Sequence, residues 1–293
     1  MAILIPDFQL TATAHIGVVA LNVSNLVKMT DFYERVIGLT LLESTENQSV
    51  LGVKDQALLI LTKIENPLPV TRKTGLYHVA FLLPTREALG DALLHYLQIE
   101  APIAGASDHG YSEALYLTDP EGNGIEVYRD KPMSEWTIKE DGEIVGVTEE
   151  LDGDGVLEAA SRHWQGFPKG TIVGHVHLKV SDLDQTQTFF TEVLGLSLKN
   201  DFGNQAKFFA AGSYHHHIGS NIWLGTHIPA MEPNDLGLNY YTFEVPLAEL
   251  TRLEKHWKTK TIDYEKNEEG QLILFDPNGI QVRITGRNTQ IDA

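Results

Sequence analysis

The chain has 293 residues, of which 42% are hydrophobic and 21% charged, a composition typical of a soluble globular protein of about two domains. Its formal net charge of −18 argues against nucleic acid as a partner, because phosphate binding needs clustered Lys and Arg, and also against docking on anionic membranes. The chain has no cysteine, which excludes disulfides and thiolate ligands. Any metal must therefore be bound through nitrogen and oxygen atoms.

Nothing in the sequence indicates export or insertion into a membrane. Residues 1–7 contain neither a basic segment nor a long apolar stretch, so no signal peptide is expected. No apolar run approaches the ~20 residues that a membrane-spanning helix needs. We therefore expect a cytoplasmic protein without membrane partners.

The sequence contains an internal repeat. Residues 31–39 return as residues 188–196, an offset of 188 − 31 = 157. Residues 17–26 return at the same offset as residues 174–183, and Val18 of the first copy corresponds to His175 of the second. Because duplicated scaffolds keep their packing positions, residues that differ between the copies are candidates for function.

The repeat divides the chain into two halves of similar length. We predict an N-terminal domain over residues 12–130 and a C-terminal domain over residues 170–286. Residues 131–169 between them are polar and acidic and are predicted to be a linker with one short helix at 155–164.

Each half contains the same order of elements twice, a strand, a helix and further strands. A strand at 17–23, with alternating and β-branched residues, precedes a helix at 26–37 that ends at Gly38. The other elements of the first half are predicted as strands at 40–43, 49–53 and 57–62, a strand from 77 to 84, a helix at 86–98, and strands at 113–117 and 124–128. Those of the second half are predicted as a strand from 174, a helix at 184–194, and strands at 221–224, 239–246 and within 272–282.

Four β-α-β-β-β modules of this kind, the second of which closes with Asp-Pro-Glu-Gly-Asn-Gly-Ile-Glu at residues 119–126, resemble the vicinal oxygen chelate superfamily. The two-domain layout resembles the type I extradiol dioxygenases of the catechol 2,3-dioxygenase group. The resemblance implies an α+β fold in which four βαβββ modules form two open, cup-like mixed β-sheets.

The resemblance also implies where a metal would be bound, on the first and last strands of a module. The corresponding positions here are Val18, His78, His175 and Tyr240 on first strands, and Glu126 and Gln281 on last strands. Only His78, Glu126 and His175 form a plausible ligand set. Two imidazoles and one carboxylate make the facial triad of Fe(II) oxygenases, and Mn(II) suits the same ligands. His177 lies two residues from His175, on the same strand face, and is an alternative ligand.

The distribution of these ligands departs from the family pattern, in which the site lies in the C-terminal half with ligands from modules three and four. Here His78 and Glu126 come from module two, and His175 comes from module three. We therefore predict that module two pairs with module three in one ligand-bearing cup. Modules one and four would form an inert cup lined by Val18, Tyr240 and Gln281.

The family pattern implies three further site residues. His216, within the run 214–219, would be an acid–base imidazole near dioxygen, a role that suits a group titrating near neutrality. Which of His215, His216 and His217 faces the site stays open. His109 would bind or protonate the substrate oxyanion, and Tyr116 would orient it.

The resemblance thus implies an Fe(II)-dependent extradiol dioxygenase that cleaves a catecholic ring with O2. Its partners would be the catechol, O2 and, through exposed sheet edges, a second copy in a homodimer. One alternative is a glyoxalase- or epimerase-like metal-dependent lyase or isomerase, which usually uses an additional carboxylate that we do not find. Another is a metal-free small-molecule-binding protein, which the intact triad disfavours.

Overall fold

The computed structural model describes residues 3–69 and 71–288. Residues 1 and 2, which begin the segment where no signal peptide is expected, lie outside the described residues. Within the described residues the strands form two mixed sheets of eight strands each. This arrangement confirms the predicted α+β fold class with two curved sheets. None of the described helices is long and apolar enough to cross a membrane.

The first sheet has the order β14-β15-β16-β13-β1-β4-β3-β2. Its strands are β1 (His15–Val23), β2 (Thr40–Ser44), β3 (Gln48–Val53), β4 (Gln56–Lys63), β13 (Gly237–Pro246), β14 (Glu265–Lys266), β15 (Leu272–Phe275) and β16 (Gln281–Arg287). Strands β1 and β13 meet antiparallel at its centre. The sheet therefore joins module one (β1–β4) to module four (β13–β16).

The second sheet has the order β10-β11-β12-β9-β5-β8-β7-β6. Its strands are β5 (Gly75–Leu82), β6 (Ile103–Asp108), β7 (Ser112–Thr118), β8 (Gly124–Asp130), β9 (Ile172–Lys179), β10 (Ser197–Phe202), β11 (Ala206–Ala210) and β12 (Ile218–Asn221). Strands β5 and β9 meet antiparallel at its centre. The prediction that module two (β5–β8) pairs with module three (β9–β12) is confirmed.

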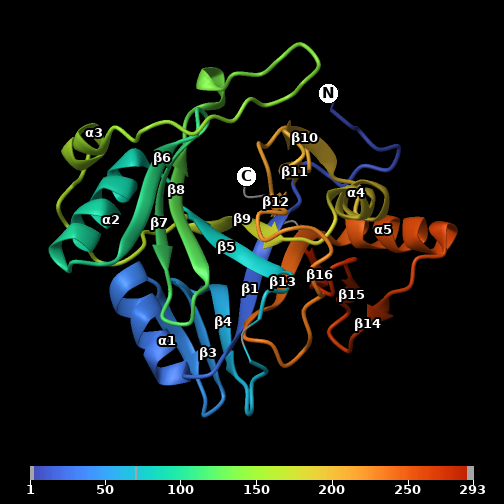
Figure 1. Cartoon of the computed structure of the whole chain (residues 1–293), viewed down its shortest axis with the longest axis horizontal. Coiled ribbons are helices and arrows are strands. Elements are labelled where there is room, and N and C mark those ends of the chain that lie inside the picture. The colour runs from blue at the N-terminus through green and yellow to red at the C-terminus, as the bar shows by residue number, and fades with distance from the viewer. Residues whose placement is uncertain (1–2, 70, 289–293) are drawn as a thin grey trace.

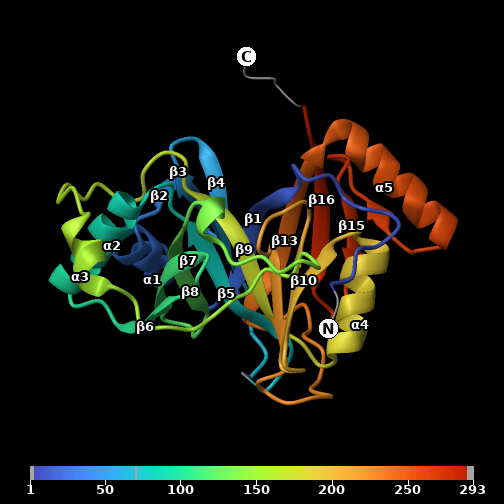
Figure 2. The same ribbon diagram turned by 90° about the horizontal axis from the view of Figure 1, so that it is seen from above.

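Helices lie at the outer ends of the molecule. They are α1 (Leu26–Phe32), α2 (Arg86–Gln98), α3 (Gly153–Glu158), α4 (Leu183–Thr188) and α5 (Leu247–Lys260), with a 3-10 turn at Met133–Glu135. Figures 1 and 2 show α1 and α2 at one end, beside the strands of the N-terminal half, and α4 and α5 at the other. Each sheet thus contains strands from both halves of the chain.

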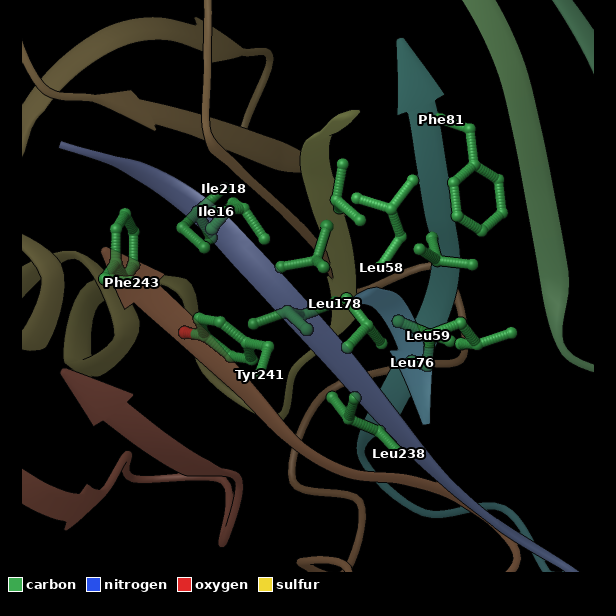
Figure 3. Close-up of a cluster of buried hydrophobic side chains, with 14 of the residues drawn as sticks. Ile16, Leu58, Leu59, Leu76, Phe81, Leu178, Ile218, Leu238, Tyr241 and Phe243 are labelled. Carbon is green, nitrogen blue, oxygen red and sulfur yellow. The ribbon is translucent and has the colours of Figure 1, made fainter. Parts of the chain in front are cut away.

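The main hydrophobic core lies where the two sheets pack against each other. Strand β1 contacts β9, and β13 contacts β5. Figure 3 shows Ile16 of β1, Leu178 of β9 and Phe243 of β13 among the buried side chains of this cluster. Complete burial of one such side chain stabilises the fold by about 1.5–3 kcal/mol relative to its exposure. This packing fixes which face of each central strand remains for a site.

The repeated sequence of residues 31–39 and 188–196 forms the same irregular helix ending twice. In both copies the α-helix continues into a π-helix, at Tyr33–Ile37 after α1 and at Phe189–Val193 after α4. The predicted end at Gly38 is confirmed, because this glycine has a left-handed backbone with φ of 101°.

Several boundaries differ from the prediction. The strand predicted at 221–224 is wrong, because β12 ends at Asn221, whose side-chain oxygen accepts a hydrogen bond from the Trp223 N–H at 3.2 Å and turns the chain. The short helix predicted at 155–164 occupies Gly153–Glu158. The prediction also lacked β6, β10, β11, β14 and α5.

Candidate active site

Three buried side chains from neighbouring strands converge at the centre of the second sheet. They are His78 of β5, Glu126 of β8 and His175 of β9. The Nε2 atoms of His78 and His175 lie 3.2 Å apart, and Glu126 Oε2 lies 3.0 Å from the first and 3.3 Å from the second. Among the described residues this is the one group of three or more such side chains with the spacing of a metal site.

Close contact between β5 and β8 makes this convergence possible. His78 is paired with Gly124 in the parallel ladder of these strands. A Cβ atom at position 124 would lie 2.2 Å from the carbonyl oxygen of Tyr77 and 3.1 Å from His78 Cβ. Glycine at this position therefore lets the strand that bears Glu126 approach the strand that bears His78.

The electrostatics of the three residues fit a divalent cation. Burial opposes ionisation of Glu126, yet the neighbouring His175 and His78 hold its pKa well below the usual range. Burial lowers the pKa of His175 to about 4, so its imidazole is neutral near pH 7. A carboxylate and imidazoles with free lone pairs, all aimed at one point, are the donor set that Fe(II) and Mn(II) accept.

His177 lies on the same face of β9 but outside this group. Its ring packs edge-on against Tyr77 and at a tilt against Trp223, with ring centroids 5.2 and 5.4 Å away. Its Nε2 atom is buried and has no hydrogen-bond partner in the described structure. The geometry therefore favours His175 over His177 as the candidate ligand.

The equivalent place in the first sheet carries no such group among the described residues. Tyr240 is paired with Gln281 there, whereas in the second sheet His78 is paired with Gly124 and not with Glu126. The Arg283 guanidinium lies 3.4 Å from the centre of the Tyr240 ring. A cation of the protein itself thus covers the position that corresponds to a histidine in the other sheet.

His109 and Tyr116 form a hydrogen-bonded pair beside His78. The Tyr116 hydroxyl and His109 Nε2 are 2.6 Å apart, while His109 Nδ1 lies 2.8 Å from the Val147 carbonyl oxygen. Because a carbonyl can only accept, the proton is on Nδ1, and Nε2 accepts from the tyrosine. Burial and the charge of Glu126 raise the pKa of Tyr116, which keeps its hydroxyl protonated.

His216 ends a chain of three side chains. Asp130 Oδ1 lies 2.9 Å from His215 Nε2, and the Nδ1 atoms of His215 and His216 are 2.7 Å apart. The His216 ring also lies 4.2 Å, centroid to centroid, from that of His175. Burial and the neighbouring imidazoles lower the pKa of His216 well below its usual value, so its ring is neutral.

The three histidines of the run 214–219 are all buried, but their rings have different surroundings. His216 lines the cavity described below. His215 lies behind it against Asp130, and the His217 Nδ1 accepts a hydrogen bond from the Ala211 N–H at 3.3 Å. Of the three, His216 is thus the one that faces the cavity, and its acid–base role stays a prediction.

A cavity of about 680 Å³ opens onto these residues. All six predicted site residues line it, namely His78, His109, Tyr116, Glu126, His175 and His216. This volume is within the range of small-molecule sites, roughly 300–1,000 Å³.

Sequence reasoning missed the part played by the linker. Gly146, Val147 and Thr148 line the cavity, and the Val147 carbonyl holds His109. The only signal was the apolar pattern of Ile144, Val145 and Val147 in an otherwise acidic segment. The pattern could not have specified that a backbone carbonyl meets a histidine.

Comparison with known proteins agrees with this geometry. Residues 15–127 match the family model described as glyoxalase/bleomycin resistance protein/dioxygenase superfamily. The catechol-2,3-dioxygenase of Bacillus subtilis (strain 168) is 43% identical over 241 residues, which cover 80% of this chain and 84% of that protein. The chain belongs to the catechol-2,3-dioxygenase family of this superfamily.

Solved structures share the fold of almost the whole chain of this catechol-2,3-dioxygenase family member. A putative dioxygenase from Bacillus subtilis subsp. subtilis str. 168 has a TM-score of 0.61 at 13% identity, with 94% of this chain and 86% of that chain covered. Glyoxalase I from Zea mays has a TM-score of 0.57 at 13% identity, with 94% and 92% covered. The fold is thus shared by enzymes of different names, so the reaction has to be argued from the site.

Proposed function

We propose that the protein is a metal-dependent extradiol dioxygenase that cleaves a catecholic ring with O2. The observation that carries the proposal is the convergence of His78, Glu126 and His175 in one cavity. Membership of the catechol-2,3-dioxygenase family supports it. An isomerase of the glyoxalase kind would be expected to use an additional carboxylate at the metal. The group of candidate ligands among the described residues has one carboxylate, Glu126, which favours the dioxygenase.

The proposed metal is Fe(II), held by His78, Glu126 and His175, with Mn(II) as the other ion that suits this donor set. When bound, it supplies the Lewis acidity and the one-electron redox chemistry that ring cleavage by O2 requires. These three side chains would hold the ion, and the cavity that they line has room for the catechol and O2.

His109 and Tyr116 are proposed to bind and orient the catechol. Tyr116 remains a hydrogen-bond donor because its pKa is raised, by burial first and by Glu126 second. His109 is kept in place by the Val147 carbonyl, and its Nε2 accepts from the Tyr116 hydroxyl, so it would take up a substrate proton through that hydroxyl. The pair thus provides a donor and a proton acceptor within the same cavity.

His216 is proposed to transfer protons on the side of the cavity near His175. Its Nδ1 is engaged with His215, so Nε2 is the nitrogen available to the reactants. A neutral imidazole takes up a proton there and returns it at a later step, which is the ordinary use of histidine in acid–base catalysis.

The proposal is tested by comparing two histidines of one strand. We expect His175→Ala to lose the bound metal and O2 uptake with catechol, and His177→Ala to retain the metal. Metal content per chain is measured by mass spectrometry of the purified proteins, and O2 uptake with an oxygen electrode. Retention of metal by the first variant would contradict the ligand assignment. Metal-loaded wild type that consumes no O2 with any catechol would contradict the reaction.

The homodimer expected from the sequence and the cytoplasmic location remain predictions. Strands β2, β6, β10 and β14 are the edges of the two sheets and the surfaces available for such pairing. Light scattering coupled to gel filtration measures the molar mass, for which a monomer of 32.6 kDa is the reference.

A further inference from the structure

One end of the cavity carries polar side chains that the reaction above does not use. Along β9, Val176 and Leu178 belong to the core between the sheets, so His175, His177 and Lys179 alternate onto the opposite, cavity face. Lys179 is therefore on the same face as the metal ligand His175, four residues further along the strand.

The neighbouring strand β12 places an amide beside this lysine. Asn221 is paired with Lys179 in the parallel ladder of β9 and β12. Gly219 is on the same face of β12 as Asn221, because a Cβ at Gly219 would lie 2.9 Å from the His177 ring. Both Lys179 and Asn221 line the cavity.

These two side chains present donors without acceptors in the described structure. Asn221 Nδ2 is buried, at 1% residue exposure, and has no hydrogen-bond partner. Its oxygen is already used by the Trp223 N–H, so the amide group is held with its NH2 unsatisfied. A buried unsatisfied donor is costly and favours an external acceptor.

Lys179 has no counter-ion among the described residues, just as Asn221 Nδ2 has no acceptor. Burial alone lowers its pKa, with no contribution from a neighbouring carboxylate. Among the described residues, the one carboxylate side chain that lines the cavity is Glu126, which belongs to the metal-type group. The lysine and the amide therefore form a positively charged, donor-rich part of the cavity wall.

Aromatic side chains line the space between this end and the ligand group. Tyr77 and Trp223 stand edge to face, with ring centroids 5.0 Å apart, and both contact the His177 ring. Such a wall accommodates the apolar ring or chain of a ligand and offers few competing polar contacts.

We propose that the Lys179 ammonium and the Asn221 amide bind a carboxylate carried by a side chain of the catecholic substrate. This inference rests on the proposed ring-cleavage function and names its substrate class. The Cα atoms of His175 and Lys179 are about 13 Å apart along the strand, from about 3.3 Å per residue. That span suits a catechol ring with a carboxylate on a chain of two or three carbons.

The test compares an acid with its neutral counterpart on the metal-containing enzyme. The probes are 3-(3,4-dihydroxyphenyl)propanoate and its methyl ester. Two quantities are measured, kcat/KM from O2 uptake and Kd under argon from quenching of tryptophan fluorescence. Because a hydrogen bond to a charged group discriminates by about tenfold to a hundredfold, we expect the wild type to prefer the acid by that factor.

Three lysine variants isolate the charge. Lys179→Met should reduce the acid-to-ester ratio to within about threefold of unity, and Lys179→Arg should restore part of the preference. Lys28→Met, an exposed position on α1, is the matched control and should keep the wild-type ratio. Asn221→Ala should also reduce the ratio, and its circular dichroism spectrum and metal content identify a variant that has not folded.

The outcomes separate this inference from the proposed reaction. O2 uptake with both probes but an equal kcat/KM and an equal Kd in the wild type would overturn the carboxylate site and leave ring cleavage standing. A ratio unchanged in Lys179→Met would also overturn it. If no probe supports O2 uptake, the reaction fails, and the Kd ratio under argon alone decides the carboxylate site.

Discussion

Hydrogen bonds to neighbouring residues fix which nitrogen of His216 can exchange a proton with the substrate. Asp130 accepts from His215 Nε2, so the His215 Nδ1 must accept from His216 Nδ1 when both rings are neutral. This leaves the lone pair on His216 Nε2, on a ring that lines the cavity. The acidic side chain of Asp130 thus acts on the site through His215 without contacting the reactants.

Substitution of His216 should separate proton transfer from metal binding. We expect His216→Asn to lower kcat by about 10²–10⁴-fold, the usual contribution of general acid–base catalysis, while the metal content stays unchanged. Steady-state O2 uptake and metal analysis of the same preparation provide the two readouts. His163→Asn, at an exposed histidine, is the control.

Asp130→Asn should show the same split with a smaller loss of kcat, because the aspartate only positions His215. Loss of metal in either variant, or kcat within twofold of the wild type for His216→Asn, would contradict the role given to this chain of residues.

At the same scale, the sequence predicted which residues meet but not how they are held. The module positions of His78, Glu126 and His175 were sufficient, because the two first strands β5 and β9 are paired and the last strand β8 is paired with β5. His109 and the Val147 carbonyl that holds it are 38 residues apart in the chain, and Asp130 and His215 are 85 residues apart. No local pattern encodes such contacts.

At the level of elements, the site depends on how closely two strands approach. Strand β8 carries Glu126 past β5 at Gly124, where a side chain would overlap the Tyr77 carbonyl. The helices tolerate more irregularity, since both π-helical endings lie away from the cavity at the outer ends of the sheets. Geometric precision is therefore concentrated in the central strands.

A methyl group at this contact should weaken the metal site. Gly124→Ala places a Cβ 2.2 Å from the Tyr77 carbonyl oxygen, so β5 and β8 must separate locally. We expect a destabilisation of about 1–3 kcal/mol, typical of overpacking, and a weaker affinity for the metal. Competition with a chelator measures the affinity, and urea unfolding measures the stability.

The matched control is Gly153→Ala, at a glycine with no atom within 4 Å of its ideal Cβ. It should change neither quantity. A Gly124→Ala protein that holds its metal as tightly as the wild type would show that the approach of these strands is not what positions Glu126.

The repeat did not secure every element, because the helix α2 was predicted whereas its counterpart in module four, α5, was missed. The helix Arg86–Gln98 has the predicted bounds, and the strand that contains His78 was found in place. The strands β10 and β11 were missed because their residues lack clear alternation, and β12 was shifted because Asn221 ends it with a side-chain hydrogen bond. Such endings are decided by tertiary contacts as much as by propensity.

At the scale of the whole molecule, His217 couples folding to pH. It is buried near the contact of the two sheets, with its ring 6.4 Å from that of Phe243 on β13, and its Nδ1 accepts from Ala211. Burial lowers its pKa to about 3, whereas an unfolded histidine titrates near 6.5. Protonation therefore favours the unfolded chain, so its contribution to stability is complete above about pH 6.5 and declines as pH falls toward 3.

Between pH 7 and pH 5 this residue should cost the fold about 2 kcal/mol. We expect His217→Asn, which keeps an acceptor for the Ala211 N–H but does not titrate, to show a pH dependence shallower by that amount. Urea unfolding at the two pH values measures it, with His163→Asn as the control. Parallel curves for wild type and His217→Asn would refute the assignment.

Because module two pairs with module three, the candidate metal ligands are divided between the two halves of the chain. His78 and Glu126 belong to the N-terminal half and His175 to the C-terminal half, so neither half holds the ligand group alone. Each half produced separately would also leave β5 or β9, a central strand of the second sheet, with an unpaired edge. We expect residues 1–150 and 151–293, expressed singly, to bind no metal and to aggregate.

Production of both halves together should restore the ligand group, because the contacts that join them are made by strand pairing and by the core between the sheets rather than by the linker alone. Metal content and O2 uptake of the co-purified halves are the measurements, with the intact chain as reference. A single half that binds one metal ion per chain would mean that its two modules pair with each other. That result would contradict the exchange of modules on which the site depends.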